Sequence, residues 1–453
     1  MEAVTALPKA GRWYNAVWRW HFYAGMLCIP FVIWLACTGA IYLWRPQLEA
    51  WLDRPYDHLA PSGPAASPDA QVAAALAVVP GSTLHKYVLP DAPDQAVRIL
   101  VTRHGEDMRV YVHPRTLAIL KVAVEEKRPF RMIFHLHGEL LAGAVGSYLV
   151  ETATCWTVVM LLTGLYLWWP RGRRGLAGVL YPRLRSGRRL FWRDIHATAG
   201  IWVSVFALAL ILTGLPWAKG WGSYLTEIRQ VTGTARGPVD WTIGGKPPKQ
   251  DTMSGDHAGH GSMVMAAPAI RPGELARVVA AARMFEVAPP VLISPPTRPG
   301  APWAISSDAA DRPLRSDLKV DGASGRIVSR VAFAQRHWID RAIGYGVAGH
   351  EGALFGIANQ IIGTATALLL VVLAGSGAIM WWRRRPSGLL GAPVPSARPR
   401  FGIGLLGAIG ALGLYLPLFG ASLIGVLLLE RLLFRFMPAT RRWLGLEASR
   451  AMR

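Results

Sequence analysis

The stretch HLHGELLAGAVGSYLVETATCWTVVMLLTGLYLWWPR, residues 135–171, returns in outline at residues 350–384 as HEGALFGIANQIIGTATALLLVVLAGSGAIMWWRR. Counted from His137 and from His350, the residues Leu, Gly, Gly, Trp, Trp and Arg recur at offsets of 4, 6, 27, 31, 32 and 34. A second pair of segments starts at His21 and His196, each followed by Ala, Gly, Thr and Gly at offsets of 3, 4, 17 and 18. Internal self-similarity of this kind indicates a duplicated structural unit.

The apolar runs that carry these histidines indicate a membrane protein. The chain has 453 residues, of which 52% are hydrophobic and 17% charged, whereas about a quarter of the residues of soluble proteins are charged. Four runs, at about 21–44, 148–169, 196–217 and 357–382, are long enough for a helix to cross the roughly 30 Å apolar core of a bilayer. The segment 401–436 has Pro417 in its middle and is expected to form two short spans or a buried hairpin.

The basic residues predict the orientation in the membrane. Residues 170–193 contain eight Arg and no acid, and residues 383–400 contain five Arg and no acid, and short basic loops stay in the cytoplasm. The long segments 45–130 and 218–349 therefore face outward. The formal charge of +21 mostly reflects this topology, so we expect no nucleic-acid partner. The Trp pairs at 168–169 and 381–382 are predicted to anchor in the membrane interface.

The predicted fold is an α-helical polytopic membrane protein built from a duplicated helix–periplasmic α/β module–helix unit, with a C-terminal hydrophobic hairpin. Within the outer segments, helices are expected at 67–79 and 271–285, followed by strands at 97–103, 108–122, 291–296, 303–307 and 317–331. The expected domains are four transmembrane helices at 12–44, 135–170, 193–217 and 350–382, outer modules at 45–134 and 218–349, cytoplasmic loops at 171–192 and 383–400, and the hairpin at 401–436.

The duplication pairs the histidines. A parallel repeat has its pseudo-two-fold axis along the membrane normal, so we expect His21 to meet His196 near the cytoplasmic face and His137 to meet His350 near the outer face. Two imidazoles facing each other in a helical bundle suit a six-coordinate haem iron. No C-x-x-C-H occurs, so the prediction is two non-covalent haem b groups. Interfacial histidines that bind headgroups or backbone are the alternative.

Two details of these sites stay open at this stage. His135 precedes His137 by two residues and is an alternative ligand, although the repeat favours His137. Glycines near the histidines either leave room for a flat macrocycle or allow close helix packing; they are Gly25, Gly200, Gly143 and Gly356.

A separate candidate metal site lies in the second outer segment. The stretch DTMSGDHAGHGSMVM, residues 251–265, contains thioether and imidazole groups that suit copper, above all Cu(I): Met253, His257, His260, Met263 and Met265. The same composition describes a plain flexible loop.

The ordered motifs HxxxG…TG, FHLHGELLAG…TGLYLWWPR, FWRDIHATAG…LTGLPW and HEGALFG…SGAIMWWRRR, over about residues 12–386, resemble the PepSY-associated transmembrane family. The resemblance implies a bacterial inner-membrane, haem-containing reductase that acts on a ferric siderophore or another periplasmic metal chelate. It also supports the four repeat-matched histidines as haem ligands.

Because no flavin or nicotinamide domain is visible, the electron donor is expected to be a quinol or a cytoplasmic reductase that docks on the Arg-rich loop. Two other functions stay open. One is a metal-handling membrane protein without redox turnover, for copper or another metal, and the other is a PepSY-type interaction or regulatory module.

Overall fold

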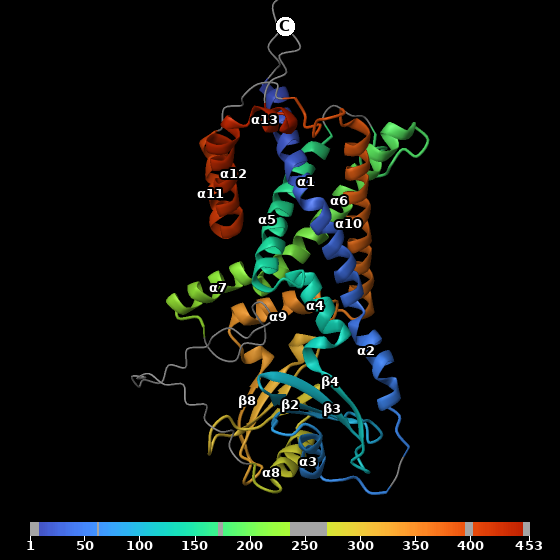
Figure 1. Cartoon of the computed structure of the whole chain (residues 1–453), viewed down its shortest axis with the longest axis vertical. Helices are drawn as coiled ribbons and strands as arrows, with labels where there is room; N and C mark the ends of the chain where they lie inside the picture. The colour runs from blue at the N-terminus through green and yellow to red at the C-terminus, as the bar shows by residue number, and fades with distance from the viewer. Residues whose placement is uncertain (1–8, 61–62, 171–174, 236–269, 395–401, 447–453) are drawn as a thin grey trace, which may run out of the picture.

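The computed structural model describes residues 9–60, 63–170, 175–235, 270–394 and 402–446. Within them, five helical segments are long and apolar enough to cross a membrane: Trp13–Leu43, Gly143–Trp168, Arg188–Trp217, Ile357–Arg384 and Pro417–Phe436. Four of these form the core bundle in Figure 1, as helices α1 (Lys9–Leu43), α5 (Gly143–Trp168), α6 (Arg188–Gly214) and α10 (Ile357–Arg384). Helix α1 packs against α5 and α10, and α6 packs against the same two helices. The chain is therefore a helical membrane protein, as its apolar runs predict.

Two of the expected spans are interrupted at the end of the bundle that lies nearer the sheet. The predicted helix 135–170 is divided into α4 (Pro129–Glu139) and α5, and residues 350–382 are divided between α9 (Trp338–His350) and α10. Leu140 and Leu141 have φ values of 51° and 57°, and Gly356 has a φ of 56°. Left-handed residues cannot continue a right-handed helix. His137 and His350 thus lie on separate helices that precede the spans, which corrects the expected bounds.

The outer segments form one antiparallel sheet of eight strands in the order β4-β3-β2-β1-β5-β6-β7-β8, rather than two separate modules. The halves join where β1 pairs with β5, with Tyr87 opposite Ile293. This pairing covers two strand edges that separate modules would expose. The strands are β1 (Thr83–Leu89), β2 (Val97–Arg103), β3 (Glu106–Val112), β4 (Ile119–Val124), β5 (Val291–Ser294), β6 (Trp303–Ser307), β7 (Ser316–Val320) and β8 (Ile327–Ala332).

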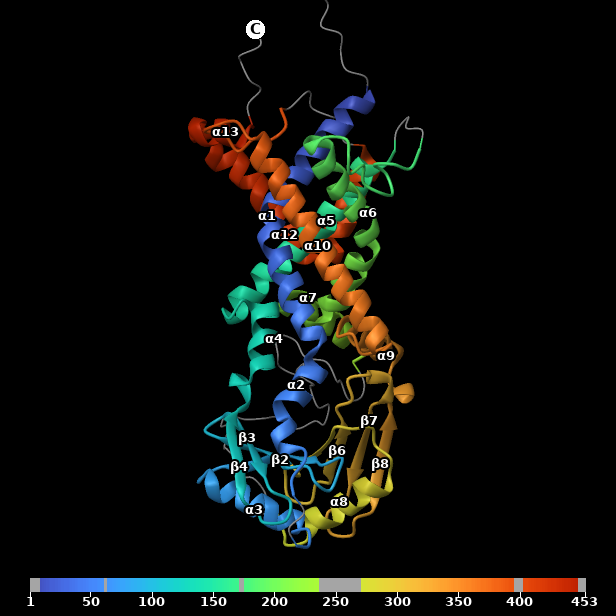
Figure 2. The same cartoon turned by 90° about the vertical axis from the view of Figure 1, so that its right-hand side faces the viewer.

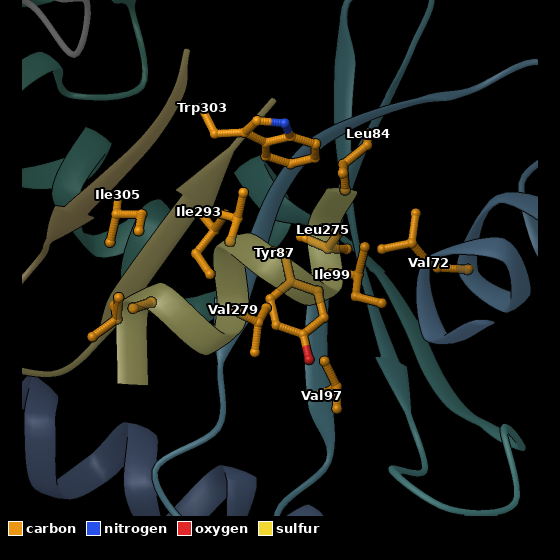
Figure 3. Close-up of a cluster of buried hydrophobic side chains, with 14 of the residues drawn as sticks. Val72, Leu84, Tyr87, Val97, Ile99, Leu275, Val279, Ile293, Trp303 and Ile305 are labelled. Carbon is orange, nitrogen blue, oxygen red and sulfur yellow. The ribbon is translucent and has the colours of Figure 1, made fainter. Parts of the chain in front are cut away.

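Helices α3 (Pro68–Val78) and α8 (Glu274–Met284) cover one face of this sheet (Figure 2). Their apolar sides pack on inward residues of both halves in a single core, in which Val97, Ile99 and Ile293 are fully buried (Figure 3). Alternate strand residues point to this face, as expected for a sheet covered on one side. The sheet domain is thus one folded unit, although its strands come from segments separated by two transmembrane helices.

The C-terminal segment is a helical hairpin made by α11 (Ile403–Tyr415) and α12 (Pro417–Leu428). The two helices approach closely at Gly413 and Gly420, where a side chain on either residue would meet the backbone of the other. The tip of the hairpin buries Leu416 and Phe419 against Cys155 of α5. The segment is therefore a hairpin, but not the buried one that was expected, because within its described residues α11 has no buried side chain and α12 has only Phe419.

Short elements complete the structure. They are α2 (Arg45–Asp53), η1 (Arg54–Tyr56), η2 (Glu125–Lys127), η3 (Leu215–Trp217), α7 (Lys219–Val231), η4 (Arg312–Leu314), η5 (Phe333–Gln335), a π-helical turn (Leu429–Leu433), η7 (Phe434–Phe436) and α13 (Pro438–Leu444).

Candidate functional site

Two histidines face each other at the end of the bundle nearer α13, and we call them the inner pair. The ring centroids of His21 on α1 and His196 on α6 are 6.2 Å apart, with an angle of 80° between the ring planes. The Nδ1 atom of His21 lies 3.0 Å from the carbonyl oxygen of Met160, and that of His196 lies 2.9 Å from the carbonyl oxygen of Leu373. A carbonyl oxygen can only accept a hydrogen bond. Each Nδ1 therefore carries the proton, and the lone pair of each ring is on Nε2.

A second pair lies at the end of the bundle nearer the sheet, and we call it the outer pair. The ring centroids of His137 on α4 and His350 on α9 are 6.4 Å apart, at an interplanar angle of 71°. The Nδ1 atom of His350 donates to the carbonyl oxygen of Leu210 at 2.9 Å. The Nδ1 atom of His137 is 2.9 Å from the Thr38 hydroxyl, which already donates its proton to the carbonyl oxygen of Trp34. Both outer rings thus also leave Nε2 available.

The separation within each pair matches two rings bound to one metal ion. An imidazole nitrogen binds a first-row metal at about 2.0–2.1 Å, and its ring centre lies roughly 1.1 Å beyond it, so rings on opposite sides of one ion have centroids about 6.2–6.4 Å apart. The observed values are 6.2 and 6.4 Å. The structure therefore brings together the four histidines that the repeat selects, in the two pairs that it predicts, at a distance suited to bis-imidazole ligation.

Each histidine rests on a hydroxyl-glycine dipeptide of a neighbouring helix. The hydroxyl lies 2.9–3.3 Å from the ring Nδ1. A Cβ on the glycine would lie 3.1–3.3 Å from the ring Cε1. The dipeptides are Thr163–Gly164 under His21, Thr38–Gly39 under His137, Ser376–Gly377 under His196, and Thr213–Gly214 under His350. We call these dipeptides the histidine seats.

The seats are the part of the site that the sequence pattern did not predict. Thr38–Gly39 and Thr213–Gly214 are matched in the repeat, which predicts no role for them, and Thr163 and Ser376 are not among the matched residues. The sequence does contain a pattern that could have predicted the seats, because one Thr-Gly or Ser-Gly dipeptide occurs in each of the four core helices.

The glycines expected to make room for a macrocycle divide into two groups. Gly25 and Gly200 line the inner cavity, and a Cβ on them would meet its nearest atoms at 3.9 and 3.5 Å. Gly143 and Gly356 instead have φ values of 54° and 56° at the breaks before α5 and α10. Their role is conformational, which corrects that interpretation.

Each pair of histidines lines a cavity. The inner cavity has a volume of about 760 Å³, and the outer cavity about 240 Å³. Val32 lines both, so the two cavities approach each other at the middle of the bundle. Apart from the histidines, Arg193 and Arg384 are the charged side chains among the described residues that line the inner cavity. A flat, largely apolar group carried by two axial imidazoles fits these surroundings.

The other candidate ligands do not join these pairs. His135 lies on α4 with Nδ1 3.1 Å from a carboxylate oxygen of Glu139 and Nε2 2.8 Å from one of Glu126, so both of its nitrogens have carboxylate partners. The copper candidates Met253, His257, His260, Met263 and Met265 lie outside the described residues. Among the residues that the structure does describe, no group of three or more His, Cys, Asp or Glu side chains is arranged to hold a metal ion.

The family model of the PepSY-associated TM region matches residues 18–384. The chain belongs to the PepSY-associated transmembrane family. The matched region contains both histidine pairs and all four seats, whereas the α11–α12 hairpin lies beyond it. The comparison with curated proteins finds no match.

The sheet domain of this PepSY-associated protein fixes the helices that carry the outer pair. Arg109 of β3 donates to both carboxylate oxygens of Glu125 at 2.7 and 2.9 Å, and Arg128, just before α4, donates to Glu125 and to Glu49 of α2 at 3.1 Å. Burial raises the pKa of Glu125, but the hydrogen bonds and charges of the two arginines outweigh it and hold that pKa below its usual value. The start of α4 is therefore tied to the sheet.

Helix α9, which ends at His350, is held by a buried ion pair. Arg229 of α7 donates to both carboxylate oxygens of Asp340 at 2.7 and 2.8 Å, and the two side chains are 3% and 1% exposed. A bidentate pair of this kind fixes orientation as well as distance. The outer pair thus depends on contacts in both halves of the extramembrane region.

The tryptophan pairs of the PepSY-associated region have two different roles. The first tryptophan of each pair donates its indole N–H to a loop carbonyl, Trp168 to Val179 at 2.9 Å and Trp381 to Leu390 at 2.8 Å. The second of each pair, Trp169 or Trp382, is about two-thirds exposed. Only the second residue of each pair therefore suits the predicted anchoring role. The first residue holds a connecting loop against the end of its helix by a hydrogen bond.

Proposed function

We propose that this protein is a di-haem b reductase of the bacterial inner membrane that carries electrons to a periplasmic acceptor. His21 and His196 would hold one haem near the cytoplasmic face, and His137 and His350 a second haem near the periplasmic face. The single observation that supports this most is the recurrence, at both levels, of two rings about 6.3 Å apart whose Nδ1 protons are already bonded.

The side chains around each pair prepare it for this role. Hydrogen bonds from Nδ1 to a helix carbonyl or hydroxyl fix the tautomer and ring orientation, and they raise the basicity of Nε2. The apolar lining excludes water from the space between the rings. Bound in these sites, haem iron would supply reversible one-electron transfer. The seats of the first half match those of the second half in position and composition, which supports the proposed duplication of the helix–module–helix unit.

The acceptor and donor follow from the proposed topology and the family. A ferric siderophore or another chelated metal is the proposed acceptor on the side of the sheet domain, because one-electron reduction of a chelated metal requires no proton-transfer residue. A quinol in the bilayer or a cytoplasmic reductase is the proposed donor. The basic cytoplasmic residues would attract an acidic reductase.

A visible absorption spectrum of the detergent-purified protein, oxidised and then dithionite-reduced, tests the proposal, with haem quantified per chain. We expect two low-spin b-type haems, re-oxidised by a ferric chelate. His196→Ala should remove one haem and stop turnover, whereas His135→Ala should retain both, because both nitrogens of His135 contact carboxylates and not the pair.

A protein that stays colourless after haem reconstitution would contradict the reductase. Metal loss on deletion of residues 253–265 from such a protein would then favour metal handling without redox turnover. Unchanged function after replacement of all four paired histidines would favour an interaction or regulatory module.

A further inference from the structure

The two cavities differ in the charge of their linings. Arg193 and Arg384 line the inner cavity, and no Asp or Glu among the described residues does so. The outer cavity shows the reverse, because Glu139, Glu151 and Glu351 line it and no described Arg or Lys does. The inner cavity therefore suits an anionic group, and the outer cavity does not.

The inner arginines are held in place by named contacts. Asp194 is fully buried and accepts hydrogen bonds from Arg183 at 2.7 Å and from Arg193 at 3.0 Å. Arg384 donates from Nε to the carbonyl oxygen of Met380 at 3.1 Å, and its guanidinium lies over the ring of Trp18. Both arginines are thus held beside the cavity that His196 also lines.

The charge of this cluster is not balanced within it. Arg183, Arg193 and Arg384 together with Asp194 have a formal charge of +2. A haem b group has two propionate carboxylates, and a guanidinium binds a carboxylate through two parallel hydrogen bonds. The cluster therefore has an excess of positive charge, to which the two propionate carboxylates are complementary.

We propose that Arg193 and Arg384 bind the propionate carboxylates of the inner haem, so that its propionate edge faces the cytoplasmic loops. This inference rests on the proposed function. The outer haem would be held by its histidines and apolar contacts, without arginine at its cavity. The two sites would thus differ in whether they bind the propionate carboxylates, although their histidine pairs are alike.

Haem dimethyl ester, in which both propionates are esterified, provides the test. The full chain is prepared without haem and titrated with haem b or with the ester, and binding is followed by the low-spin absorption bands. In the wild-type protein we expect one of the two sites to bind the ester roughly tenfold to a hundredfold more weakly than haem b. A loss of this size is typical when hydrogen bonds to a charged group are removed.

Variants assign that site to the arginines. Arg384→Gln should weaken haem b at the sensitive site by about tenfold or more and leave ester binding there unchanged, whereas Arg383→Gln, a neighbour that does not line the cavity, should behave as wild type. Equal binding of both compounds at both wild-type sites overturns the propionate contacts but leaves the proposed function intact, and would indicate that the arginines bind another anion such as a lipid phosphate. If the wild-type chain binds neither compound, the proposed function fails as well.

Discussion

The histidine seats lead to a prediction for Gly39→Ala. A Cβ at this position would lie 3.1 Å from Cε1 and 3.6 Å from Nδ1 of His137. Ordinary carbon–carbon contacts are about 3.5–4.0 Å, so the ring must move by roughly 0.4 Å or more. It cannot slide freely, because the hydroxyl of the adjacent Thr38 holds its Nδ1 at 2.9 Å. Metal–ligand distances tolerate only about 0.2 Å of change.

We expect haem to bind the outer site about tenfold to a hundredfold more weakly. This is the usual loss of affinity when a residue that orients a metal ligand is changed. The fold itself should not be weakened, since Ala in place of Gly in a helix interior is favourable by up to about 1 kcal/mol. The assay is haem per chain and low-spin signal during haem titration, with thermal unfolding of the haem-free protein measured in parallel. Gly375→Ala is the matched control, because a Cβ there meets nothing within 4 Å. Equal haem affinity in the two variants would refute the reasoning.

Three further predictions concern the supports of the pairs. Thr163→Val should weaken inner-haem binding by up to about tenfold, because His21 keeps its bond to Met160 and loses one neutral hydrogen bond; Thr163→Ser should restore it in the same titration. Asp340→Asn should destabilise the protein by about 3–5 kcal/mol, since it leaves the buried Arg229 charge unbalanced, and outer haem should be lost before inner haem on heating. The folded-state pKa of Glu125 is lowered, so its stabilisation is complete above its ordinary pKa of about 4.5 and is lost as the pH falls through the folded value. The hydrogen-exchange protection factors of the β3 amides, corrected for the intrinsic exchange rate at each pH, should therefore fall on acidification in wild type. They should fall less in Glu125→Gln, which is already less protected at neutral pH.

The sequence repeat was sufficient to predict which histidines meet. Matching offsets place His21 opposite His196 and His137 opposite His350 without any knowledge of helix packing. The repeat alone also favours His137 over His135, and the structure adds the reason that His135 lies between the carboxylates of Glu126 and Glu139. Neither carboxylate forms part of the repeat.

The interrupted spans show where local pattern failed. Residues 135–170 are apolar enough to suggest one helix, but the chain turns at Leu140 and Leu141, two residues that rarely adopt a left-handed conformation. The break places α4 outside the span, so its last turn can direct His137 toward α1. Tertiary contacts, here the ring of His137 on its seat, override the helical preference of leucine.

The joined sheet was equally hidden from local pattern. The strand β1, Thr83–Leu89, was missed, although it lies at the centre and pairs with both β2 and β5. Its partner β5 starts at Val291, about two hundred residues later, and a contact of that range leaves no periodic signal. The helices and most of the remaining strands were predictable because apolar periodicity is a local property.

The arrangement of the seats indicates how a bound ligand would join the two halves of the bundle. In the first half, His21 of α1 rests on α5 and His137 of α4 rests on α1. The second half repeats this exchange, with His196 of α6 on α10 and His350 of α9 on α6. Each ring is therefore fixed by a helix of its own half and points its Nε2 toward the other half. A ligand held between the rings would join the halves at two levels, and because it binds only the assembled bundle, its binding free energy would add to the stability of the whole transmembrane core.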